Sequence, residues 1–263
     1  MKYLLSKSSL VIASGLAKER TLCAFDFDGT LSPIVDHPDL AVMRANTRDL
    51  LRRLAVLYPC IIVSGRARAD VLEKLSGINV VQVIGNHGAE TGGGAISSHH
   101  QIDQWRAALE LELKSVSGVW VEDKGMSLAI HYRQSPQKTD ACRRILAATR
   151  KLRVAQVFGG KQVVNVVVTG APNKGDALAA ERDRLGCNWV LYVGDDANDE
   201  DAFGLSGNIV SVRIGQKARS RARYYLHTQA EIDELLELLV QLRERPAPAE
   251  TIPMQVSLAN CEE

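Results

Sequence analysis

The stretch LCAFDFDGT, residues 22–30, joins an apolar run to two acids that stand two positions apart. The apolar residues predict a buried strand over 22–26, so Asp26 and Asp28 lie at its carboxyl end. Open parallel α/β sheets bind their ligands at the carboxyl ends of the strands. One carboxylate as nucleophile, with a second as acid and base, can form and hydrolyse an aspartyl-phosphate. Asp-Gly is also a common turn signal, so these residues alone leave a purely structural turn open.

Two further polar residues stand at the ends of predicted elements. Ser64 follows the apolar run 60–63, where its hydroxyl could donate to a phosphate oxygen or cap the helix that follows. Lys174 lies at a predicted helix start, with Asn173 as the expected cap. Because a cation at that position opposes the helix dipole, neutralising phosphate and aspartate charge explains Lys174 better than a structural role does.

Three acids follow the strand pattern at 189–193, namely Asp195, Asp196 and Asp199. Carboxylates this close repel one another unless protons or a cation compensate. Mg²⁺ suits such a site, because it prefers oxygen ligands and shares substrate oxygens at phosphate sites. A solvated acidic turn that caps the next helix is the alternative.

Composition limits the classes of function. The 263 residues carry a net charge of +1, which gives no reason to expect a nucleic-acid partner. The five cysteines form no CxxC pair, so reduced thiols and a cytoplasmic location are expected. No segment has transmembrane length, and residues 1–20 fit a short helix packed on the core better than a signal peptide.

The order of predicted elements gives an α/β fold with an insertion. Strands and helices alternate from residue 22 to 84 and again after 170, which predicts a parallel sheet. Between them the pattern is helix-strand-strand twice over, as in a small α+β module with an antiparallel sheet. We therefore expect a Rossmann-like core over 1–98 and 170–245, a cap over 99–169 after a hinge at 91–100, and a flexible tail over 246–263.

Taken together, the motifs at Asp26, Ser64, Lys174 and Asp195 resemble those of the haloacid dehalogenase (HAD) superfamily of phosphotransferases, and the insertion resembles its type 2 cap. The segment VEDKGMSLAIHYR, residues 121–133, closely resembles the cap of trehalose-6-phosphate phosphatases. GNHGAE at 85–90 and the acidic segment 194–203 are also similar to that family. The resemblance extends from about residue 22 to 214.

The resemblance implies a Mg²⁺-dependent phosphatase for a small-molecule sugar phosphate, with trehalose 6-phosphate as the expected substrate. Asp26 is then the nucleophile and Asp28 the acid and base. Mg²⁺ is expected on Asp26, the backbone carbonyl of Asp28 and Asp195, with Asp199 in support. The residues expected to bind phosphate are Thr30, Ser64, Gly65, Arg66 and Lys174. Those expected to bind the sugar are Asn86, His87, Glu122, Lys124, Arg133 and Asn165.

Two residues depart from the family pattern. Asn165 stands where a Glu usually contacts the sugar, and Asn198 replaces the more usual Thr. Because Asn both donates and accepts hydrogen bonds, the pattern of hydroxyls that it reads could differ. A phosphatase for another glycoside phosphate (of the sucrose or glucosylglycerate type), a sugar phosphomutase and a non-catalytic sugar-phosphate-binding protein stay open. The sequence leaves the oligomeric state undetermined.

Overall fold

Parallel strands form the larger of two sheets in the computed structural model, which describes residues 1–91 and 99–244. The strand order is β1-β11-β10-β9-β2-β3-β4, and every neighbouring pair is parallel. The strands are β1 (Lys2–Tyr3), β2 (Thr21–Phe25), β3 (Cys60–Val63), β4 (Gln82–Ile84), β9 (Trp189–Gly194), β10 (Ile209–Ile214) and β11 (Tyr224–Leu226). The chain leaves β2 toward β3 on one side and returns as β9 on the other, so the order reverses beside β2. Such a switch point is where doubly wound sheets bind ligands.

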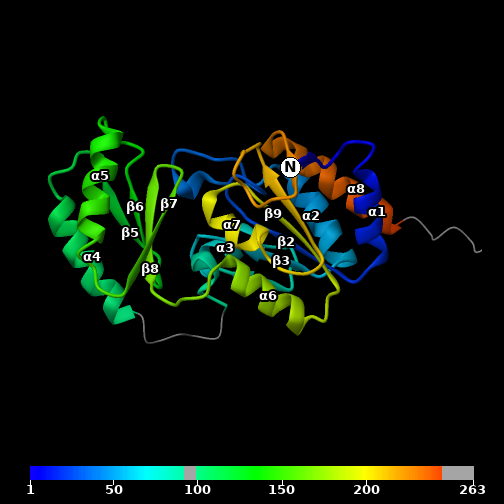
Figure 1. The fold of residues 1–263 in the computed structure, drawn as a ribbon, viewed down its shortest axis with the longest axis horizontal. Coiled ribbons are helices and arrows are strands. Elements are labelled where there is room, and N and C mark those ends of the chain that lie inside the picture. The colour runs from blue at the N-terminus through cyan, green and yellow to red at the C-terminus, as the bar shows by residue number, and fades with distance from the viewer. Residues whose placement is uncertain (92–98, 245–263) are drawn as a thin grey trace, which may run out of the picture.

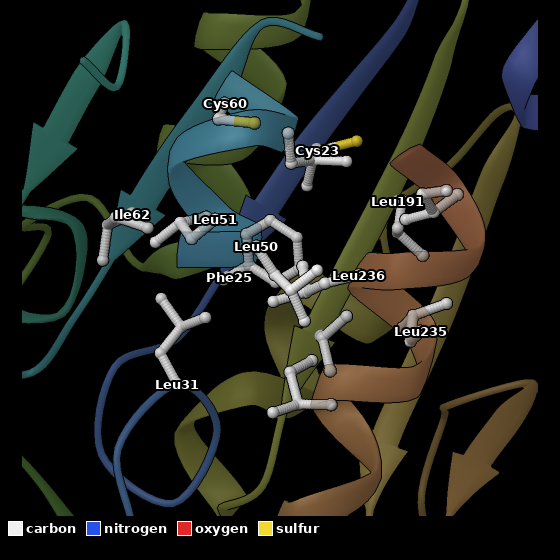
Figure 2. Packing of buried hydrophobic residues seen from close by; sticks show 14 of the residues in the cluster. Cys23, Phe25, Leu31, Leu50, Leu51, Cys60, Ile62, Leu191, Leu235 and Leu236 are labelled. Atoms are coloured by element: carbon white, nitrogen blue, oxygen red, sulfur yellow. The ribbon is translucent and has the colours of Figure 1, made fainter. Parts of the chain in front are cut away.

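Helices cover both faces of this sheet (Figure 1). They are α1 (Leu10–Lys18), α2 (Ala45–Leu57), α3 (Arg68–Lys74), α6 (Lys174–Arg184), α7 (Glu200–Phe203) and α8 (Ile232–Glu244). Alternate residues of β2 point to opposite faces, as a strand requires. Phe25 packs with Leu51 of α2 and Leu236 of α8 (Figure 2), whereas Ala24 packs with Leu178 of α6 on the other face. Burial on both faces explains why the core strands are continuous apolar runs.

A separate antiparallel sheet forms the cap, in the order β5-β6-β8-β7. Its elements are α4 (His99–Leu113), β5 (Trp120–Asp123), β6 (Ser127–His131), α5 (Lys138–Thr149), β7 (Ala155–Gly160) and β8 (Val163–Val168). Both helices pack on one face of the sheet, where Trp105 and Ile145 meet Ile130 and Val164. The opposite face is turned toward the larger sheet (Figure 1).

The structure confirms the α/β class, the parallel core sheet and the inserted α+β cap. Two short strands at one side of the sheet, β1 and β11, were not predicted. β1 pairs with β11, where Lys2 lies opposite Tyr224, and runs of two and three residues are too short to carry a periodic signal. The predicted N-terminal helix corresponds to α1. The predicted hinge falls largely on residues 92–98, which lie outside the described residues, as does the predicted tail at 246–263.

Within residues 1–91 and 99–244, no helix is long and apolar enough to cross a membrane. The four cysteines in those ranges are free thiols, and Cys23 and Cys60 lie opposite each other in the buried sheet.

Candidate active site

Asp26 and Asp195 lie next to each other at one edge of the core sheet. β2 pairs with β9 in parallel register, and each acid follows directly on its strand. The backbone NH of Asp26 donates to the carbonyl of Val193 at 2.9 Å, which continues the ladder to that edge. Only 5% of Asp26 and 4% of Asp195 is exposed. The fold thus places two carboxylates together in a largely desolvated position.

Lys174 neutralises part of this charge. Asn173 caps α6 as predicted, in a reciprocal capping box with Asp176, and thereby places Lys174 in the first turn. The Lys174 ammonium is buried 3.1 Å from Asp26 and 2.7 Å from Asp199. Burial alone would lower the pKa of Lys174, but these two carboxylates raise it above its ordinary value. Lys174 is therefore a fixed cation beside the candidate nucleophile.

Asp199 is wholly buried and saturated with hydrogen bonds. One of its carboxylate oxygens accepts from Lys174 and from the Tyr192 hydroxyl, both at 2.7 Å. The other accepts from the backbone NH groups of Asp195 and Asp196 at 2.8 and 2.9 Å. Burial opposes ionisation, but Lys174 and these donors hold the pKa of Asp199 below its usual value. This arrangement fits a supporting residue that orients the Asp195 loop.

The acid cluster fits a hard divalent cation. Carboxylate oxygens of Asp26, Asp195 and Asp199 all lie within 4.8 Å of one another. Burial and the neighbouring Asp199 raise the pKa of Asp195 to about 6, and burial likewise raises that of Asp26. A cation with oxygen ligands would relieve this repulsion. Gly29 keeps the space open, because a Cβ there would fall 2.1 Å from Asp195, and its φ of +79° also favours glycine.

Asp26 and Asp195 line a cavity that residues of the cap also border, and Asp28 lines this cavity as well. Asp28 pairs with Arg66. The guanidinium donates from Nε and Nη2 to the two Asp28 oxygens, at 2.6 and 2.8 Å. Its Nη1 donates to Asp70 at 2.6 Å, and Nη2 also donates to the Pro38 carbonyl at 2.7 Å. Arg66 is thereby fully engaged in positioning Asp28 in this structure, and its expected phosphate contact stays a prediction.

The other expected phosphate residues differ in access to this cavity. Gly65 lines it. Ser64 is wholly buried and accepts a hydrogen bond from the Arg66 backbone NH at 3.2 Å, as in the start of a turn. Thr30 is also wholly buried, and its carbonyl accepts from Gln229 at 2.8 Å. The structure thus brings Gly65 to the cavity, whereas neither Ser64 nor Thr30 is among its lining residues.

The cap closes the cavity with the face of its sheet that carries no helices. Register places two rows of residues across the strands, namely Trp120, His131, Val163 and Gly160, and beside them Glu122, Ala129, Asn165 and Phe158. Glu122 and Asn165 line the cavity together with Lys124 and Arg133. The strand period of two puts all four expected sugar residues of the cap on this one wall or at its border.

Two of these cap residues also bind the core. Lys124 donates from Nζ to the Gly65 carbonyl at 3.0 Å, and Arg133 donates from Nη1 to the Val35 carbonyl at 2.9 Å. Glu122 accepts a hydrogen bond from His131 Nε2 at 2.7 Å and lies 3.9 Å from Lys124. Burial would raise the pKa of Glu122, but His131 and Lys124 hold it below its ordinary value. The wall therefore presents an ionised acceptor beside a cation.

The loop after β4 contributes two residues with different placements. Asn86 is buried, donating to Glu90 at 2.7 Å and to the Lys124 carbonyl at 3.0 Å, so it joins core to cap. His87 lines the cavity, and its Nδ1 lies 3.2 Å from the Asn198 amide nitrogen. Burial, and then Lys124 and Lys174, hold the pKa of His87 well below its usual range, so its ring is neutral. The side chain of Asn86 is thus engaged in joining the core to the cap, while His87 lines the cavity.

The sequence reasoning missed five cap residues that line the cavity, namely Trp120, His131, Gln134, Lys161 and Val163. Trp120 and His131 lie two positions from Glu122 and Ala129 along their strands, so strict alternation would have placed both on the same wall. Lys161, at the β7–β8 turn, pairs with Asp195 across the cap–core boundary. No local pattern marked Lys161, because its partner is 34 positions away in the chain.

Comparison with known proteins adds independent information. The trehalose-phosphatase family model matches residues 24–230. The chain is 33% identical to a trehalose-phosphate phosphatase of Mycobacterium tuberculosis H37Rv, over 92% of this chain and 67% of the relative. It is also 29% identical to a probable trehalose-phosphate phosphatase D of Arabidopsis thaliana, over 89% of this chain and 70% of the relative.

A solved structure agrees with the fold. The C-terminal domain of a trehalose-6-phosphate phosphatase from C. albicans is similar with a TM-score of 0.77, at 21% identity over 92% of this chain and 98% of that chain. At that level of identity the likeness concerns the fold alone.

Proposed function

This chain belongs to the trehalose-phosphatase family, whose relatives are phosphoric monoester hydrolases of the HAD superfamily, and on that premise we propose that it hydrolyses trehalose 6-phosphate to trehalose and phosphate. One observation carries the proposal. Asp26 and Asp28 of the core line the same cavity as Glu122, Lys124 and Asn165 of the cap. A phosphate group held at the acids would leave its sugar against the polar wall of the cap.

In the first step we propose that Asp26 attacks phosphorus. The new Asp26–phosphorus bond forms as the bond to the sugar oxygen breaks, which gives an aspartyl-phosphate. Asp28 gives its proton to the departing sugar oxygen. Lys174, 3.1 Å from Asp26, supports the ionised nucleophile and the charge of the phosphoryl group.

In the second step Asp28 takes a proton from water as the water attacks phosphorus. The bond to Asp26 then breaks, which releases phosphate and restores both acids. The bidentate contact with Arg66 keeps Asp28 oriented for both proton transfers.

The residues that would hold Mg²⁺ are Asp26, the Asp28 carbonyl and Asp195, with Asp199 as support. When bound there, Mg²⁺ would neutralise charge on the transferring phosphoryl group. The cluster of three buried carboxylates supports this assignment.

Asn165 favours a second candidate, a phosphatase for another glycoside phosphate. Asn165 lies in the row of Glu122, and only 3% of the residue is exposed. Because an amide can donate to a hydroxyl as well as accept from one, it would match a different arrangement of sugar hydroxyls than a carboxylate would.

The decisive experiment measures phosphate release from phosphorylated mono- and disaccharides in the presence of Mg²⁺. The panel holds trehalose 6-phosphate, sucrose 6-phosphate and glucose 6-phosphate, with Asp26→Asn as the inactive control. We expect the highest kcat/KM with trehalose 6-phosphate. A higher value with sucrose 6-phosphate would select the second candidate. Return of the phosphoryl group to another position of the sugar, without release of phosphate, would indicate a mutase. Binding without turnover would overturn the assignment as an enzyme.

A further inference from the structure

We propose that Trp120 forms a stacking subsite for the sugar ring that does not carry the phosphate. The inference rests on the proposed function and deepens it, since it assigns a place to the second pyranose of the substrate. Trp120 lies in the first position of β5, on the wall of the cap sheet that borders the cavity.

One face of the Trp120 indole is packed against another side chain of the cap. The indole ring stacks on the His131 imidazole, with centroids 4.1 Å apart and planes at 10°. His131 is in turn fixed by the 2.7 Å hydrogen bond to Glu122. Since His131 occupies one face of the indole, the 38% of Trp120 that is exposed offers the other face and the ring edge. A rigid, exposed aromatic ring beside the polar groups of this wall is typical of a ligand-contacting side chain.

A side lobe of the cavity lies in front of this ring. It is lined by His37, Pro38, Asp39, Trp120, Glu122 and Gln134. All of these except Asp39 also border the main cavity, so the lobe is continuous with the space above Asp26. A pyranose has C–H faces and a rim of hydroxyls. The indole would meet a face, and the carboxylate, amide and imidazole groups of the lobe would meet the rim.

The position along β5 matches the length of a disaccharide phosphate. Lys124 touches Gly65 beside the phosphate centre, and Trp120 comes four residues earlier on the same extended segment. Four residues of strand span about 13 Å. We therefore expect a monosaccharide phosphate held at Asp26 to leave the indole free, and the second ring of a disaccharide to reach it.

The first test compares Trp120→Ala and Trp120→Phe on two substrates. We expect Trp120→Ala to raise KM for trehalose 6-phosphate roughly tenfold, as the loss of a stacking contact would. Its kcat/KM for glucose 6-phosphate should stay unchanged, and Trp120→Phe should restore most of the loss. Leu111→Ala, an exposed apolar position on α4, is the matched control and should alter neither substrate. Equal kinetics of wild type and Trp120→Ala on trehalose 6-phosphate would overturn the subsite while leaving the proposed function intact.

A second test needs no turnover. Trehalose titrated into the wild type should change tryptophan emission, and Trp120→Phe should abolish the change. The other two tryptophans serve as an internal background, since Trp105 is buried in the cap core and Trp189 begins β9. If the wild type does not hydrolyse trehalose 6-phosphate, the proposed function is refuted. The trehalose titration tests the subsite independently of that result. An emission change that persists in Trp120→Phe would refute the subsite.

Discussion

The ammonium group of Lys124, just after cap strand β5, donates a hydrogen bond to the backbone carbonyl of Gly65 in the core at 3.0 Å. Gly65 follows Ser64, so this contact ties the cap directly to the loop expected to hold phosphate. Lys124 also lies 3.9 Å from Glu122, which places it between the cap wall and the phosphate centre. Lys124 is therefore the cap residue best placed to couple recognition of the sugar to the position of the phosphate.

We expect Lys124→Ala to lower kcat/KM for trehalose 6-phosphate about 10- to 100-fold, the value of a hydrogen bond to a charged group. Hydrolysis of p-nitrophenyl phosphate should be largely kept, because this small ester makes few contacts with the cap and water can replace Lys124 at Gly65. The ratio of the two kcat/KM values is the measurement. Lys151→Ala, which removes a cation on the helical side of the cap, is the control. An equal loss on both substrates would mean that Lys124 holds the core loop rather than the sugar.

Arg66 offers a test between two roles. If it positions Asp28, Arg66→Lys should lower kcat by about 10- to 100-fold with little change in KM, because lysine cannot hold a carboxylate bidentately. If it binds phosphate directly, KM should rise instead. Steady-state kinetics with trehalose 6-phosphate separate the two, and circular dichroism checks that the loss of the Asp70 contact leaves the fold intact.

Much of this fold could be predicted because its signals are local. Strand β3 was predicted at the observed residues, and the apolar run before Asp26 identified the central strand β2. Predicting that the motif acids lie together needed only one further inference, that the carboxyl ends of parallel strands meet at the same edge of the sheet. Asn173 could be predicted as the helix cap because a capping hydrogen bond joins residues that are close in the chain, here Asn173 and Asp176.

What could not be predicted depends on contacts between distant segments. The Arg66–Asp28 pair joins residues 38 positions apart, and the Lys161–Asp195 pair joins cap to core. The sequence likewise did not indicate that Ser64 and Thr30 are wholly buried and absent from the cavity lining. The position of Trp120 could have been found by extending the alternation of β5 by one step, but its stacking on His131 requires the register of β5 and β6.

Asp195 should control metal binding. Burial raises its pKa to about 6, and a protonated carboxyl is a poor ligand, so the Mg²⁺ concentration needed for a half-maximal thermal shift should rise as pH falls below about 6. Asp195→Asn should abolish that shift. It should also raise the metal-free melting temperature, because it removes a charge that burial disfavours. Differential scanning fluorimetry with and without chelator measures both effects. A Mg²⁺ shift of wild-type size in Asp195→Asn would place the metal elsewhere.

His87 should make stability depend on pH. Its pKa is held well below the ordinary value of about 6.5, chiefly by burial, so the unfolded chain binds a proton that the folded chain excludes. The stability from the neutral ring is therefore present above pH 6.5 and is lost as pH falls below it, by at most about 1.4 kcal/mol per pH unit. His87→Asn, which tolerates the local φ of +60°, should reduce this slope in urea unfolding between pH 5.5 and 7.5. The exposed His100→Asn should leave the slope unchanged, and an unaltered slope in His87→Asn would contradict the assignment.

Asn165 should decide which disaccharide phosphate is preferred. It is buried in the row of Glu122 and lines the cavity, so it can be matched only by a partner of complementary hydrogen bonding. A site with such a buried polar group rejects a ligand that leaves it unpaired. If the native substrate is another glycoside phosphate, Asn165→Glu should shift preference toward trehalose 6-phosphate. If the site is already tuned to trehalose with Asn, the same change should lower activity.

Asn165→Gln separates the effect of side-chain length from that of charge, since Gln matches Glu in size. The measurement is kcat/KM for trehalose 6-phosphate divided by that for sucrose 6-phosphate. A ratio that is the same in wild type, Asn165→Glu and Asn165→Gln would show that this position does not read the sugar.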